Sequence, residues 1–140
     1  MISVTRLDIS DADILIGGAV AKANALGVPM CIAVTDEAGQ LMAFCRMDGG
    51  KVTSTTIAID KAFTAAGAKK ATHEYGIASQ PGAPAYGIAS AIGGRLMVVG
   101  GGYPVLVDGK AVGGIGVSSG TPDQDMAVAQ AGIEAFHKHV

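Results

Sequence analysis

Apolar residues along the chain gather in short runs that predict strands. The runs at 30–35 and 41–47 are rich in Val, Ile, Met and Phe, and the Asp-Glu-Ala-Gly segment between them is typical of a turn. Such a short connection predicts an antiparallel hairpin. Three further runs lie at 96–99, 103–107 and 111–117, and Asp-Gly-Lys between the last two predicts a second hairpin. The pattern therefore predicts a five-stranded sheet that is antiparallel.

Helical segments precede and separate these runs. A first helix is expected to begin at Ser10, whose hydroxyl can cap it, and to end at Gly27, with Pro29 just beyond. A second, alanine-rich helix is expected to begin at Thr53 or Ser54 and to run to about residue 70. Both helices carry enough small and apolar residues to pack closely on a sheet.

The last helix has the strongest start signal. Thr121 is the expected N-cap, Pro122 takes the first helical position, and Gln124 completes a capping box, so a helix to about residue 137 is predicted. Between 72 and 94 no regular structure is expected beyond a short helical turn, because a Pro-Gly-Ala-Pro segment interrupts it. The order of elements predicts one α/β (α+β) domain over residues 1–140, with helices covering the sheet.

Composition narrows the class of protein. A chain of 140 residues suits a single domain, and 49% apolar residues can fill its core. Aromatic residues make up only 4%, so Ala and Gly must fill much of the interior. The formal charge is −2 and the basic residues are scattered, which argues against nucleic-acid binding.

The cysteines and the N-terminus point to a cytoplasmic protein. Cys31 and Cys45 lie in strand-like runs without C-x-x-C spacing, so buried structural thiols are expected rather than a redox or zinc motif. The first ten residues have neither a basic region nor an apolar core of the kind a signal peptide needs. No apolar run approaches the roughly 20 residues of a membrane span, so no membrane partner is expected.

A glycine-rich strand end followed by a helix start is one candidate site. Backbone N–H groups at a helix N-terminus attract anions, and glycines let a ligand come close. A carboxylate or a haem propionate would suit this place, although the glycines could instead make room for a neighbouring helix. The candidate ligand-binding residues of this segment are Gly114, Gly116, Ser118, Gly120, Thr121, Gln124 and Asp125.

Two cationic residues are candidate catalytic groups. Arg46 can hold a carboxylate in a bidentate fork beside Asp48, or it can pair internally with Asp48 or Asp36. Lys61 lies with Thr64 on one face of an alanine-rich helix. If Lys61 is buried, its pKa falls and it can act as a base or a Schiff-base amine; if exposed, it is an ordinary solvated lysine.

Several segments in register resemble one known family. They are 34–41 (VTDEAGQL), 44–50 (FCRMDGG), 61–65 (KAFTA), 101–105 (GGYPV), 112–121 (VGGIGVSSGT) and 124–125 (QD). These segments resemble the GlcG/HbpS family, which includes the C-terminal domain of PduO, over essentially the whole chain. Gly50 and Ser119 replace the Ala and Gly that are commoner in the family at these positions.

The resemblance implies a profilin-like, three-layer α/β/α fold and a homo-oligomer with an even number of subunits. It also implies that haem or a related tetrapyrrole is a possible ligand, since some members of the family bind haem. Other members are encoded in catabolic operons. The low aromatic content argues mildly against a dedicated haem pocket, but not against binding at a surface or an interface.

If haem binds, two residues are the candidate iron ligands. Tyr103 follows a triple glycine, and a phenolate can ligate haem iron; otherwise it is a core or interface tyrosine with a satisfied hydroxyl. His73 follows the second helix and is the other candidate. His137 and His139 stand two apart, which does not place them on one helical face, and no zinc motif is present.

Small residues on the last helix suggest where subunits meet. They would allow a partner to approach closely, while two larger side chains fill its groove. The small residues are Ala127, Ala129, Ala131 and Gly132, and the larger ones are Met126 and Phe136.

Three functions therefore remain open from the sequence. The first is a small oligomeric ligand-binding protein of the GlcG/HbpS type. The second is an enzyme acting on a carboxylate or hydroxy acid through Lys61 and Arg46. The third is an assembly or regulatory protein without small-molecule chemistry.

Overall fold

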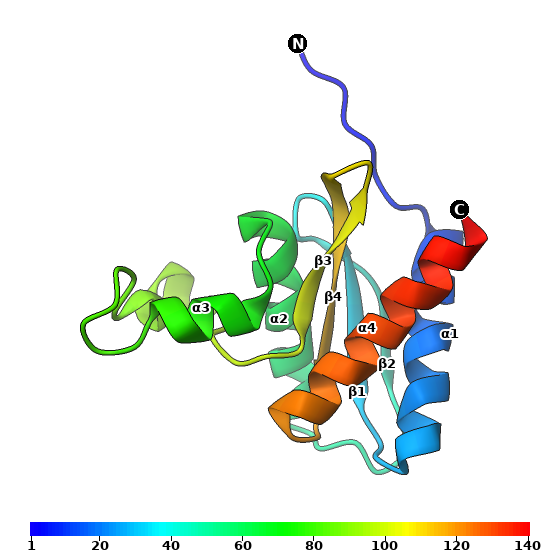
Figure 1. The fold of residues 1–140 in the computed structure, drawn as a ribbon. Coiled ribbons are helices and arrows are strands. Elements are labelled where there is room, and N and C mark those ends of the chain that lie inside the picture. Colours follow the sequence, from blue (N-terminus) through cyan, green and yellow to red (C-terminus); the bar gives the residue numbers. More distant parts are fainter.

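A computed structural model describes all of residues 1–140 (Figure 1). Its elements in chain order are α1 (Ile9–Leu26), β1 (Cys31–Asp36), β2 (Leu41–Arg46), α2 (Ser54–Ala68), α3 (Thr72–Ala78), the 3-10 turns η1 (Ile88–Ser90) and η2 (Ile92–Gly94), β3 (Gly102–Val107), β4 (Lys110–Ser118) and α4 (Pro122–His139).

The strands form one antiparallel sheet in the order β2-β1-β4-β3. Helices α1 and α4 pack against one another on one face of the sheet, and α2 covers the other face (Figure 1). The expected α/β/α layering is therefore present. The predicted fifth strand is wrong, because the sheet has four strands and residues 96–99 belong to none of them.

Side chains and helices hold the segment around 96–99 away from the sheet. The Thr64 hydroxyl on α2 donates to the Arg95 carbonyl at 3.2 Å and accepts from the Met97 N–H at 3.0 Å. The Val98 carbonyl lies against Gly76 of α3, where a Cβ would come within 2.5 Å of it. These backbone groups are bonded or covered by α2 and α3, so they do not form a ladder with a strand.

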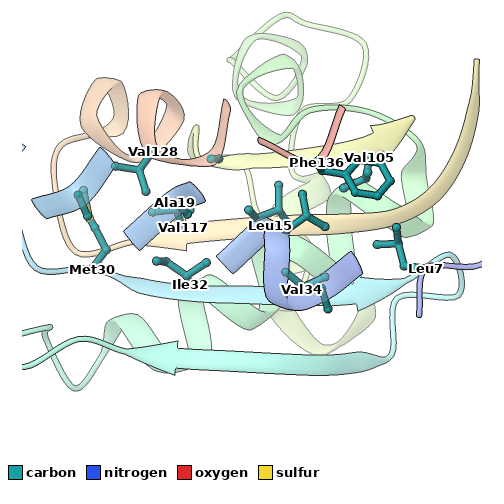
Figure 2. Close-up of a cluster of buried hydrophobic side chains, with 14 of the residues drawn as sticks. Leu7, Leu15, Ala19, Met30, Ile32, Val34, Val105, Val117, Val128 and Phe136 are labelled. Atoms are coloured by element: carbon teal, nitrogen blue, oxygen red, sulfur yellow. The ribbon is translucent and has the colours of Figure 1, made fainter. Parts of the chain in front are cut away.

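The main core lies between the sheet and the α1–α4 layer. Figure 2 shows Leu15, Ile32, Val117 and Phe136 among the side chains that meet there. The opposite face is built from smaller residues, such as Ala33 of β1, which allow α2 to lie close to the sheet. β1 is buried along its whole length because helices cover both of its faces.

Small residues on α4 serve contacts within the chain. A Cβ on Gly132 would come within 2.6 Å of the Leu15 carbonyl, and one on Gly18 would come within 2.6 Å of the Ala135 Cβ. The two helices therefore cross closely where these glycines meet. Phe136 is only 2% exposed and lies in the core, so the expectation that it fills a partner's groove is wrong.

The predicted helix signals are confirmed at the start of α4 and at the end of α1, but not at the start of α1. Thr121 and Gln124 form the predicted capping box at the start of α4, and Gly27 ends α1 in the left-handed conformation. At the start of α1 the prediction was wrong, because Asp8 and Asp11 form the capping box and Ser10 lies inside the helix. None of the helices combines the length and apolar character that crossing a membrane requires.

Candidate functional site

A buried ion pair joins the two helical layers at the end of the sheet. Lys61 extends from α2, and its side chain is 1% exposed. Its Nζ donates to the Val117 carbonyl of β4 at 2.8 Å and to Oδ2 of Asp125 at 3.0 Å. Asp125 belongs to the first turn of α4, which packs on the other face of the sheet. One side chain thus connects α2 to α4 past the end of β4.

Two glycines leave room for the Lys61 side chain. A Cβ on Gly101 would lie 2.9 Å from Lys61 Nζ and 2.9 Å from the Asp125 Cβ, and Gly101 has a φ of +128° that favours glycine. On the neighbouring strand, a Cβ on Gly116 would lie 3.0 Å from the Lys61 Cβ. This packing accounts for glycine at two positions of the family-like motifs.

The ion pair occupies the place that the sequence assigned to an anionic ligand. Asp125 Oδ1 accepts a hydrogen bond from the Gly120 N–H at 2.9 Å, so this backbone donor already has a carboxylate partner. Burial lowers the pKa of Lys61, and the charge and hydrogen bond of Asp125 oppose this shift. The structure therefore brings the predicted residues Lys61, Gly120 and Asp125 together as an internal network, and Lys61 has almost no contact with solvent.

The other residues near the strand ends have structural contacts. A Cβ on Gly114 would lie 3.0 Å from the Ala66 Cβ, so this glycine makes room for α2. The Ser118 hydroxyl donates to the Ser54 hydroxyl at 3.1 Å. Thr121 and Gln124 bond each other in the capping box. Thr64, as described above, anchors residues 95–97 to α2.

Arg46 and Asp48 lie apart from this network. Both are exposed at the end of the edge strand β2. They form no ion pair with each other, and Asp36 pairs instead with Arg6, whose Nε lies 3.7 Å from Asp36 Oδ2. The internal ion pairs considered for Arg46 are therefore absent, and its guanidinium faces solvent.

A partly apolar hollow of about 420 Å³ lies where α3 meets the segment before β3. We call it the His73 hollow; it is lined by His73, Gly76, Ile77, Gln80, Val98, Val99, Gly100 and Pro122. Its base is anchored because the Thr72 hydroxyl accepts a hydrogen bond from the Gly102 N–H at 2.9 Å.

His73 of this hollow is a neighbour of Tyr103, which does not itself line the hollow. Their ring centroids are 5.7 Å apart with an interplanar angle of 53°. The Nδ1 atom of His73 is buried and has no hydrogen-bond partner. Burial raises the pKa of the Tyr103 hydroxyl, and the charge of Glu74 raises it further. The tyrosine is therefore protonated at neutral pH, while the imidazole retains an unused nitrogen.

The walls of the hollow were not identified from the sequence. Ile77 lies on α3, in a stretch where no regular helix was expected, and Val98 and Val99 were assigned to a strand. The available signal was Thr72, which can begin a helix, followed by apolar residues before the Pro-Gly-Ala-Pro segment. Because the Pro-Gly-Ala-Pro segment interrupts the pattern, the sequence does not predict this helix.

The fold and this site define a small α/β/α domain with a partly apolar surface hollow, lined by a histidine whose ring contacts a tyrosine. A family model described as "Haem degrading protein HbpS-like" matches residues 7–134. The chain belongs to this HbpS-like family, as its motifs predicted.

Individual relatives agree with this assignment. The chain is 40% identical over 116 residues to a 15.0 kDa protein of the dhaT-dhaS intergenic region of Citrobacter freundii, covering 83% of this chain and 82% of that protein. It is similar to the crystal structure of Klebsiella pneumoniae protein ORFY, with a TM-score of 0.95, 32% identity and coverage of 98% and 94%. It is also similar to the crystal structure of a PduOC:heme complex, with a TM-score of 0.90, 38% identity and coverage of 94% and 95%.

Proposed function

We propose that this protein binds haem, or a related tetrapyrrole, in the His73 hollow. The observation that carries the proposal is His73, which lines a partly apolar surface hollow and whose buried Nδ1 has no hydrogen-bond partner in the protein. A buried polar atom without a partner costs free energy. Coordination to a metal is one way in which an imidazole nitrogen gains a partner.

The residues around His73 suit a flat apolar group. Ile77, Val98 and Val99 offer aliphatic surface. Gly100 makes room for the Met126 side chain, whose sulfur would lie 2.8 Å from a Cβ at this position. The volume of about 420 Å³ falls within the roughly 300–1,000 Å³ of typical ligand sites. When bound, haem supplies an iron centre for ligand or electron exchange; the chain supplies one nitrogen donor and an apolar wall.

His73 is the better iron donor of the two aromatic candidates. A tyrosine ligates haem iron as the phenolate, and burial together with Glu74 holds the Tyr103 pKa above its ordinary value. Iron would have to displace this proton. We therefore assign the donor role to His73 and a packing role against the imidazole to Tyr103. The PduOC:heme complex, at 38% identity, supports haem as the ligand.

Titration with haemin tests the proposal. Absorbance in the Soret region is expected to shift and to saturate with the wild-type protein. H73A is expected to weaken binding by about tenfold or more, because the iron loses its donor. H139A is the matched control, since His139 is exposed at the end of α4. No saturable shift, or equal affinity in H73A, contradicts the proposal.

We also propose that the protein forms a homo-oligomer through the arm of residues 76–91, which includes the end of α3. This segment contains no charged residue and extends from the body of the domain (Figure 1). Ile77 is 73% exposed and Tyr86 71%, which is unusually apolar for a solvated surface. Light scattering is expected to give an even multiple of the monomer mass, and Y86E to reduce it; a monomer contradicts the proposal.

A further inference from the structure

A second hollow lies between α2, α3 and residues 92–96. It has a volume of about 250 Å³ and shares no lining residue with the His73 hollow. We call it the Phe63 hollow; it is lined by Phe63, Thr64, Gly67, Ala68, Tyr75, Ile92 and Leu96. It therefore offers two aromatic rings and two aliphatic side chains in a protein with few aromatic residues.

A cation lies over each of these aromatic rings. The Arg95 guanidinium carbon is 3.8 Å from the Phe63 ring centroid, and the Lys70 Nζ is 5.1 Å from the Tyr75 centroid. Asp60 accepts from Nε of Arg95 at 2.9 Å, and the remaining guanidinium N–H groups have no protein partner. The Arg95 side chain is 45% exposed, so those N–H groups are accessible to an anion.

The backbone is strained at Ile92, which lines the hollow. Ile92 has a φ of +54°, which is rare for a β-branched residue, and Gly93 and Gly94 follow with φ of +65° and +82°. This conformation presents Ile92 at the hollow with 58% of its surface exposed. Strained backbone of this kind concentrates at ligand sites.

We infer that the Phe63 hollow binds a one-ring aromatic carboxylate. The aromatic and aliphatic walls favour a flat ring. Arg95 and Lys70 do not line the hollow, but they stack on its Phe63 and Tyr75 rings, and the free N–H groups of Arg95 favour a carboxylate beside the Phe63 ring. The volume of about 250 Å³ lies below the roughly 300 Å³ at which sites for larger ligands begin, so a tetrapyrrole does not fit. This site is independent of haem binding.

The probe is benzoate, and its binding is monitored through the amide chemical shifts of the full-length protein. Its addition is expected to shift the amides of Gly67, Ala68 and Ile92 in a saturable manner. Benzamide, which has the same ring and no charge, is expected to bind about tenfold more weakly. No saturable shift at these amides, or equal affinity for benzamide, overturns the inference.

Variants separate the role of the cations from that of the fold. R95Q is expected to weaken benzoate binding about tenfold, and K110Q, at the exposed lysine that begins β4, is expected to leave it unchanged. K70Q is a second charge-removing variant that leaves the Arg95–Asp60 pair in place. Unchanged affinity in both R95Q and K70Q overturns the inference. H73A is expected to bind benzoate normally, so failure of the haem proposal is distinguishable from failure of this one.

Discussion

Lys61 and Asp125 belong to helices on opposite faces of the sheet, yet Nζ and Oδ2 are 3.0 Å apart in the interior. Their side chains are 1% and 4% exposed. The pair connects the three layers at the end of β4, immediately before the loop that begins α4. Because Pro122 of α4 also lines the His73 hollow, the pair fixes one border of the proposed haem site.

Removal of one partner of this pair is expected to destabilise the protein strongly. K61A leaves the Asp125 carboxylate buried without its cation, which typically costs about 3–5 kcal/mol in the free energy of unfolding. The double variant K61M/D125L removes both charges and is expected to recover much of that loss, since no unpaired charge then remains buried. Urea unfolding measures both values.

The control for this prediction is E134Q, which disrupts an exposed pair between Glu134 and Lys138 on α4. A change below about 1 kcal/mol is expected there, because solvent screens the interaction. If K61A proved as stable as E134Q, the buried pair would not hold the layers together.

Glycine at position 101 is expected to be essential for the passage of the Lys61 side chain. G101A places a methyl group 2.9 Å from Nζ and forces a φ of +128° on a residue with a Cβ, so a loss of roughly 1–3 kcal/mol is expected from the backbone conformation alone. G17A is the matched control, because Gly17 lies within α1 with nothing within 4 Å of the added methyl group. It is expected to stabilise α1 by up to about 1 kcal/mol. Thermal unfolding shows whether each variant is destabilised or stabilised. Equal changes in the stability of G101A and G17A would refute the requirement for glycine at position 101.

Thr64 is expected to anchor the segment before β3. T64V removes the hydroxyl that bonds the Arg95 carbonyl and the Met97 N–H, and a loss of about 1–3 kcal/mol is expected because buried polar groups lose their partner. The Met97 amide should also exchange with solvent faster. T56V, at an exposed threonine of the same helix, serves as the control. Unchanged exchange at Met97 would show that other contacts hold this segment.

Tyr103 is expected to make stability depend on alkaline pH. Its pKa is raised above the ordinary value of 10.0 by burial and by Glu74, so the unfolded chain loses this proton first. The stabilising contribution is complete below pH 10 and is lost as pH rises through the folded-state pKa. The wild type is therefore expected to lose stability relative to Y103F above pH 10, as measured by denaturant unfolding at several pH values. Parallel pH profiles of the two proteins would contradict this expectation.

The sequence predicts most of the regular elements because their ends depend on residues that are close together in the chain. The capping box at Thr121 and Gln124, the glycine end of α1 and the hairpin turns all depend on residues a few positions apart, so a linear pattern contains them. The family motifs were recognisable for the same reason. The start of α1 was misplaced by two residues because Asp8 and Ser10 both have side chains suited to capping.

Tertiary packing alone decided the features on which function depends. The apolar run at 96–99 has the composition of a strand, but Thr64 and Gly76 hold its backbone against α2 and α3. Likewise, the position of Lys61 on an alanine-rich helix suggests a reactive amine. The structure pairs Lys61 with Asp125, which is 64 positions away in the sequence and so is not part of any local pattern. Composition and spacing determined the family and most of the fold, because they act over short separations. The ion pair and both hollows depend on contacts between distant segments, which exist only once the layers have packed.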